Sequence, residues 1–158
     1  NFQAILLGSD QGRKVYSKKL LSLVERYSLT KKVKFFSHCK EMPLAYSIAD
    51  VVVSASIEPE AFGRVAVESQ SMEKPIVASN IGGSKETILN KKSGFLYKHD
   101  DPRELAKNLN TVIQLSQEEL KLMGNEGRKN ISKKFDVEVM CDSNLREYRK
   151  LLKINARN

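Results

Sequence analysis

The sequence contains no tryptophan, only two cysteines and no long hydrophobic run. Cys39 and Cys141 lie far apart and form no CxxC pair, so their spacing indicates neither a disulfide framework nor a zinc site. No apolar run approaches the roughly 18–20 residues that span a bilayer, and no signal peptide opens the chain. These absences predict a reduced, cytoplasmic protein.

Acidic residues are fewer than basic ones. The sequence has 19 aspartates and glutamates against 27 lysines and arginines, which gives a net charge of +8. The basic residues occur in scattered pairs on the flanks and ends of the expected helices, where they usually solvate a surface. Their excess is compatible with an anionic partner, such as the inner face of a membrane with which the protein would associate peripherally. Nucleic acid is not indicated, because the basic residues do not alternate with base-stacking aromatic residues.

What the sequence does contain is an alternation of short strands and helices. The chain has 158 residues, 41% of them hydrophobic, which is enough for one domain with a core. Helical patterns separate five β-rich runs, and this order predicts an α/β fold, a Rossmann-like doubly wound parallel sheet with helices on both faces. The predicted strands cover residues 2–7, 33–36, 51–55, 76–78 and 94–97.

The second half of the chain has the start signals of three helices. Asp101 is a capping acid before a proline at the first helical position, and Ser116 and Glu119 have the spacing of a capping box. Asp136 can cap the last helix. We predict a Rossmann-like domain over residues 1–133 and a C-terminal helix over residues 134–158.

Residues 56–68 are the most informative segment, because they connect a predicted strand to a predicted helix. The N-terminus of a helix has unpaired N–H groups and a partial positive charge, so it can bind phosphate. Glu60 and Glu68 flank this turn, and ionised carboxylates accept hydrogen bonds from hydroxyl groups. Phosphate between two sets of hydroxyls describes a nucleotide-diphosphate sugar.

In this segment the chain resembles the C-terminal half of the GT-B-fold retaining glycosyltransferases of family 4, the group 1 transferases. The resemblance rests on two glutamates separated by seven residues, Glu60 and Glu68. It covers nearly the whole chain and continues through residues 75–79, Gly82, Gly83, Glu86 and residues 93–96.

The resemblance implies a role for each residue of this motif. Glu60, the catalytic residue, would hold hydroxyls of the donor sugar, and Glu68 would hold the ribose hydroxyls. Backbone N–H groups after Glu60 would bind the diphosphate, two glycines after the next strand would contact the donor, and the loop after residue 36 would meet the base. The donor-binding residues, besides Glu68, are thus Ala61, Phe62, Gly63, Arg64, Ser37, His38, Cys39, Gly82 and Gly83.

The spacing of the two glutamates suits this role better than glycoside hydrolysis. On a fully helical path they would lie roughly 12 Å apart, and a turn shortens that distance. The paired carboxylates of a retaining hydrolase need about 5–5.5 Å. The scheme needs neither a metal nor a cofactor, and the donor would be a UDP-, GDP- or ADP-sugar.

The chain differs from a whole enzyme of this family in having one Rossmann-like domain instead of two. By the resemblance, its first strand corresponds to the second strand of the family domain, which implies that the first strand is missing. The resemblance implies that residues 1–133 bind the donor nucleotide-sugar. The acceptor, a sugar or a lipid-linked glycan, would bind through an absent N-terminal domain, and the C-terminal helix over residues 134–158 would cross back toward that domain and pack partly against it. We therefore expect a hexosyltransferase of glycan, lipopolysaccharide or glycolipid synthesis in the full-length enzyme and no sugar transfer by this fragment alone.

Two other interpretations remain open. A GT-B-like sugar-nucleotide epimerase, or a domain that binds the sugar nucleotide without catalysis, would use the same helix and ribose carboxylate. Either of these would be favoured if the full-length protein released no nucleotide in response to an acceptor. A basic nucleic-acid-binding module would instead show steep salt-dependent binding that survives Glu68→Ala.

Overall fold

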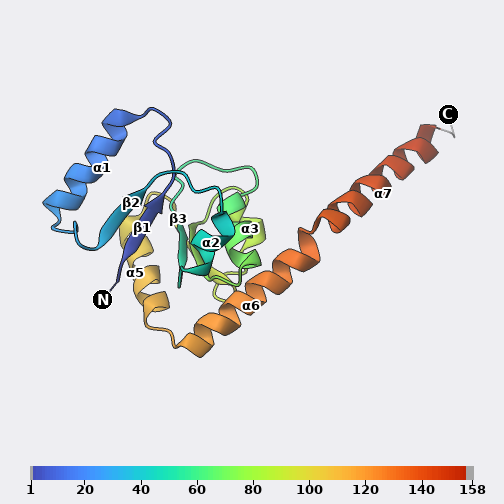
Figure 1. The fold of residues 1–158 in the computed structure, drawn as a ribbon. Coiled ribbons are helices and arrows are strands. Elements are labelled where there is room, and N and C mark those ends of the chain that lie inside the picture. Colours follow the sequence, from blue (N-terminus) through green and yellow to red (C-terminus); the bar gives the residue numbers. More distant parts are fainter. Residues whose placement is uncertain (1, 156–158) are drawn as a thin grey trace. The chain divides into compact units, whose positions relative to one another are not determined.

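A computed structural model describes residues 2–155, which form two compact units (Figure 1). Unit 1 is Asn1–Ala45 and unit 2 is Tyr46–Asn158. Every strand pair in the two units is parallel, as expected for strands joined by helical crossovers. The predicted α/β class with parallel strands and helices on both faces is confirmed.

Unit 1 contains a two-stranded sheet and the helix that connects its strands. Strand β1 (Ala4–Leu7) pairs with β2 (Val33–Phe36), and α1 (Lys14–Arg26) is the crossover. No side chain caps the N-terminus of α1. None of the described residues 2–45 is buried, so the apolar side chains of this unit all keep partial contact with solvent. Helix α2 (Met42–Ser47) spans the boundary between the units.

Unit 2 contains a three-stranded sheet in the order β3 (Val52–Ser54), β4 (Ile76–Ser79) and β5 (Gly94–Tyr97). All four residues of β4 are buried, as is typical of a central strand in a parallel sheet. Its side chains alternate between two apolar clusters, because successive residues of a strand point to opposite faces. Ile76 packs in the cluster that contains Ala66, whereas Val77 packs in the cluster that contains Val112 and Leu120.

These clusters place helices on both faces of the unit 2 sheet. Helix α3 (Arg64–Ser71) supplies Ala66 to one face, and α4 (Ser84–Thr87) follows β4. On the other face lie α5 (Pro102–Ile113) and the start of α6 (Gln117–Lys134). Helix α7 (Val137–Asn155) then ends the described chain.

The predicted start signals of the last three helices are confirmed. The Asp101 side chain accepts hydrogen bonds from the N–H groups of Arg103 and Glu104. Ser116 and Glu119 form a capping box, and Asp136 accepts from the N–H of Glu138 at the start of α7. The division into residues 1–133 and 134–158 remains a prediction.

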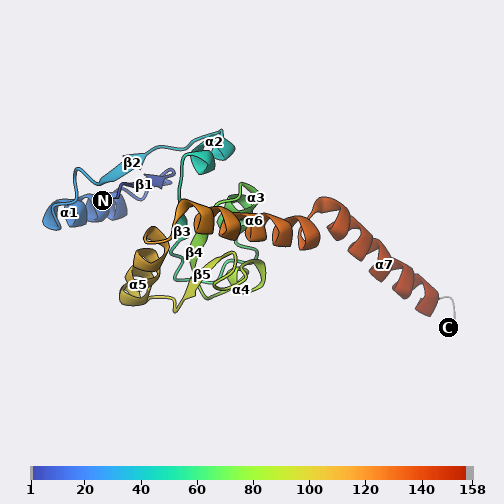
Figure 2. The ribbon, with the colours of Figure 1, turned by 90° about the horizontal axis from the view of Figure 1, so that it is seen from below.

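Two glycines allow α6 to pass close to α3 (Figure 2). A Cβ at Gly124 would collide with the Glu73 backbone, and one at Gly127 would crowd the Gln70 side chain. Beside this contact, the buried amides of Gln70 and Asn130 both donate to the carbonyl oxygen of Thr87. The helix pair and α4 are therefore joined at one backbone oxygen.

Helix α7 exposes several large apolar side chains. We expected its apolar face to pack partly against an N-terminal domain. None of the helices within residues 2–155 combines the length and the apolar character that a membrane crossing requires. The exposed apolar residues are Val137, Met140, Leu145, Tyr148, Leu151 and Leu152.

Candidate functional site

Two loops of unit 2, one after β3 and one after β4, lie directly against each other. The N–H of Gly83 donates to the carbonyl oxygen of Glu60 at 2.9 Å. A Cβ at Gly82 would collide with the backbone of Glu60, and one at Gly83 would collide with that of Phe62. Gly82 also has a positive φ of 51°. The two glycines are thus required for the close approach of the loops, and their contact with a donor stays a prediction.

The loop after β3 ends at Gly63, which is the N-cap of α3 and adopts the left-handed conformation. A Cβ there would meet Ser84 only at ordinary van der Waals distance, so the backbone conformation is the reason for glycine. No side chain caps α3, whereas Asp101 and Ser116 cap α5 and α6. The first N–H groups of α3 therefore remain available to an external acceptor.

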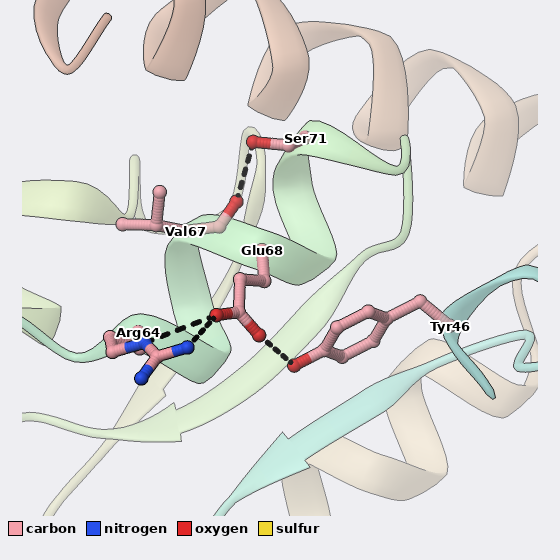
Figure 3. Close-up of polar contacts among 5 residues, drawn as sticks. All are labelled: Tyr46, Arg64, Val67, Glu68 and Ser71. Carbon is pink, nitrogen blue, oxygen red and sulfur yellow. Dashed lines mark hydrogen bonds and ion pairs between the residues drawn. The ribbon is translucent and has the colours of Figure 1, made fainter. Parts of the chain in front are cut away.

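Glu68 lies one turn into α3, and its carboxylate reaches back toward the start of the helix (Figure 3). Its Oε1 accepts from Arg64 Nε at 3.2 Å and from Arg64 Nη2 at 2.9 Å. Its Oε2 accepts from the Tyr46 hydroxyl at 2.9 Å. Side chains of a helix tilt toward its N-terminus, which explains why the partner on α3 is the residue four positions earlier.

Tyr46 is a buried residue of α2, and only 6% of it is exposed. Burial, the hydrogen bond to Glu68 and the charge of Glu68 all raise the pKa of the Tyr46 hydroxyl far above its ordinary value. Tyr46 therefore keeps its proton and acts as a donor to Glu68. The Ser71 hydroxyl, by contrast, donates to the carbonyl oxygen of Val67 within α3 rather than to Glu68 (Figure 3).

Glu60 is held by a local contact in its own loop. The Ser56 hydroxyl donates to Glu60 Oε1 at 2.5 Å, with Glu60 exposed and Ser56 half-buried. The two glutamates of the motif are thus constrained differently. Glu68 has a partner from another element, whereas Glu60 has one from within the loop.

An aromatic contact connects the same loop to the end of α6. The rings of Phe62 and Phe135 meet edge to face, with their centroids 5.8 Å apart. Phe135 is the C-cap residue of α6. The loop before α3 therefore packs against the C-terminal end of α6, through two residues that are far apart in the sequence.

The predicted site residues fall in both units. Residues 60–64, Glu68, Gly82 and Gly83 all belong to unit 2, where the two loops and α3 bring them together. Residues 37–39 follow β2 in unit 1, with Cys39 half-buried and Ser37 and His38 exposed. Their contact with a base stays a prediction. Within residues 2–155, no three His, Cys, Asp or Glu side chains lie close enough to hold a metal ion.

Sequence reasoning assigned no role to Tyr46 or Phe135. Tyr46 lies 22 residues before Glu68, and Phe135 lies in a different helix from Phe62. No periodicity connects residues at such separations. The only signal was position, because Tyr46 precedes β3, the strand that leads into the motif.

A cavity of about 230 Å³ lies elsewhere in unit 2. Its lining includes Asp50, which precedes β3, and Lys74 and Pro75, which precede β4. It is therefore at the amino ends of these strands. The candidate site is at their carboxyl ends, the edge at which open parallel sheets usually bind ligands.

The family model described as "Glycosyl transferases group 1" matches residues 1–130. Among curated proteins, the capsular polysaccharide biosynthesis glycosyltransferase CapM of Staphylococcus aureus is 30% identical over 95 residues, 60% of this chain and 24% of that protein. The D-inositol 3-phosphate glycosyltransferase of Corynebacterium urealyticum is 32% identical over 114 residues, 70% of this chain and 27% of that protein.

Two solved structures give the same result for the fold. A glycosyltransferase from Rickettsia africae superposes with a TM-score of 0.90 at 30% identity, over 97% of this chain and 41% of that chain. Alr3699/HepE of Anabaena, in complex with UDP, superposes with a TM-score of 0.85 at 32% identity, over 94% of this chain and 41% of that chain. The chain therefore spans well under half the length of these similar proteins.

Proposed function

The chain belongs to the group 1 glycosyl transferases, and on this premise we propose that unit 2 binds the nucleotide-diphosphate sugar from which the longer enzyme transfers a sugar. The observation that carries this proposal is the uncapped start of α3, flanked by Glu60 and Glu68. A similar structure that contains UDP and another that contains UDP-glucose support a donor of this class.

Each part of the site has a matching part of the donor. The free N–H groups at the start of α3 bind the diphosphate, where the partial positive charge of the helix also favours it. Glu68 accepts the ribose hydroxyls, and Glu60 accepts hydroxyls of the sugar. Gly82 and Gly83 hold the loop that contains Glu60 against the start of α4.

The same arrangement favours departure of the nucleotide. As the bond to the sugar breaks, negative charge grows on the diphosphate, and fixed N–H dipoles stabilise that charge without having to reorient. Transfer with retention, to an acceptor held by another part of the longer enzyme, completes the proposed reaction in the synthesis of a glycan or glycolipid. The chain alone binds the donor without transferring sugar, and turnover by the chain alone would contradict this.

Calorimetric titration with UDP, GDP and ADP tests the proposal and identifies the base. We expect one of the three to bind and Glu68→Gln to weaken that binding about tenfold or more, because hydrogen bonds to charged groups are strong. Glu126→Gln is the matched control, since Glu126 also pairs with a basic residue on its own helix but lies on α6. The proposal is wrong if no nucleoside diphosphate binds, or if Glu68→Gln binds as tightly as the unmodified chain.

A further inference from the structure

The Glu68 carboxylate has almost no acceptor capacity left. A carboxylate offers about four lone-pair sites. Tyr46 donates one hydrogen bond to Oε2, and Arg64 donates two to Oε1. A ligand with two adjacent hydroxyl groups needs two sites, so at least one of the present donors has to leave when such a ligand binds.

The two partners of Glu68 differ in how easily they leave. The side chain of Arg64 is 82% exposed, and water can replace Glu68 as its hydrogen-bond partner. Tyr46 is buried, and its hydroxyl makes its hydrogen bond to Glu68 in a part-buried contact, where water replaces a lost partner less readily. Arg64 is thus the exchangeable partner and Tyr46 the permanent one.

We propose that Tyr46 is a positioning residue that holds Glu68 Oε2, so that the carboxylate presents Oε1 to the ribose hydroxyls of a nucleoside diphosphate. This inference rests on the proposed function, and it adds a residue from α2 to the donor site. The ribose displaces Arg64, whereas the hydrogen bond from Tyr46 stays in place. Without that bond the flexible Glu68 side chain would turn entirely toward Arg64.

The state of the Tyr46 hydroxyl suits this task. Burial and the adjacent carboxylate raise its pKa, so it donates to Glu68 at every pH at which the enzyme would act. Because α2 leads directly into β3, the tyrosine is also anchored to the strand that precedes the motif.

The test measures discrimination between ribose and deoxyribose. The nucleoside diphosphate that binds most tightly among UDP, GDP and ADP is titrated beside its 2′-deoxy and 3′-deoxy analogues. We expect the unmodified chain to prefer the ribonucleotide about tenfold or more and Tyr46→Phe to reduce this preference to about threefold, with the affinity for the analogues nearly unchanged. Tyr97→Phe, which removes another buried tyrosine hydroxyl of unit 2, should keep the original preference.

Two results of this titration would overturn the inference while leaving the proposed function intact. One is a Tyr46→Phe variant that weakens the ribonucleotide and its analogues by the same factor, as a general structural defect would. The other is an unmodified chain that binds the ribonucleotide and its analogues equally. If no nucleoside diphosphate binds at all, the proposed function fails and this inference fails with it.

A titration without ligand tests the underlying contact separately. Tyrosine ionisation is followed by absorbance in the unmodified chain and in Glu68→Gln. Because Glu68 helps to raise the pKa of Tyr46, one tyrosine should ionise at a lower pH in the variant. Identical curves would show that Tyr46 does not bond to Glu68, and the inference would then be wrong.

Discussion

Units 1 and 2 are built from the same kinds of elements but bury very different amounts of them. In unit 2, β4 is buried along its whole length, and apolar clusters lie on both of its faces. In unit 1, two strands pair with each other, and none of residues 2–45 is buried. The charges differ too, since nine basic and three acidic residues give unit 1 a net +6, whereas 18 and 16 give unit 2 a net +2.

This difference shows where the candidate site gets its rigidity. The loops that contain Glu60, Gly82 and Gly83 extend from strands with a core on each side, so their backbones can be held in one geometry. Residues 37–39 follow a strand of a two-stranded sheet, an arrangement that is marginal without further packing. We therefore expect the unit 2 loops of the proposed site to be more rigid than residues 37–39 of unit 1.

The largest expected effect on stability comes from comparing the same Ile→Ala substitution at one position in each unit. Ile76→Ala removes a side chain that is 0% exposed in β4 and should lower the free energy of unfolding by about 2–5 kcal/mol. Ile5→Ala removes a side chain that is 51% exposed in β1 and should cost about 1 kcal/mol or less. Denaturant unfolding compares the two variants, and equal losses would show that unit 1 is as well packed as unit 2.

A pair of glycines gives the second comparison. Gly12 and Gly82 both have positive φ, but a Cβ at Gly12 meets nothing within 4 Å whereas one at Gly82 collides with Glu60. Gly12→Ala should cost about 1 kcal/mol for the backbone conformation alone, and Gly82→Ala about 2–4 kcal/mol. Thermal unfolding measures both costs, and nucleotide binding should fall only in Gly82→Ala. Similar results for the two would mean that the loops are not tightly packed.

The third comparison uses alkaline pH. The raised pKa of Tyr46 means that the folded chain retains a proton that the unfolded chain loses near the ordinary value of 10.0. The stabilisation is complete below that pH, and the free energy of unfolding should fall as the pH rises above it. Tyr46→Phe should flatten this fall in denaturant titrations at several pH values. Tyr16→Phe, which removes an exposed hydroxyl from unit 1, is the control, and equal slopes in all three chains would contradict the prediction.

The smallest effects concern helix caps. Asp101→Ala removes the cap of α5 and should destabilise unit 2 by about 1 kcal/mol. Arg13 occupies the N-cap of α1 without a side-chain hydrogen bond, so Arg13→Ser should stabilise unit 1 by about 0.5–1 kcal/mol. Hydrogen exchange of the amides in each helix separates the two effects. No change in α1 would indicate that its start cannot adopt capped geometry.

Local signals in the sequence were enough to predict the strands, the helices and their α/β class, but not the division into two units with separate sheets. Strand and helix boundaries, the capping box at Ser116 and the cap at Asp101 depend on neighbouring residues, so they can be found by inspection. That the loops after β3 and β4 lie at one edge can likewise be expected from chain order, because the carboxyl ends of parallel strands meet at the same edge of a sheet.

The contacts that position the site could not be predicted in this way. The hydrogen bond from Tyr46 to Glu68 joins residues whose separation is set by the packing of α2, β3 and α3 together. Gly82 and Gly83 were expected to contact the donor, but their spacing gave no indication that each lies against the opposite loop. Packing between distant segments, unlike capping, depends on the whole folded unit.

The close contact between the two loops also limits how the proposed donor specificity could be changed. Because Gly82 and Gly83 leave no room for a side chain against Glu60 and Phe62, a side chain at either glycine would displace the opposite loop. A library that varies these two positions should therefore vary the facing residues of the other loop as well. Exchanging both loops together, as a single cassette from a relative with a different donor, respects this constraint and is the better starting point for redesign.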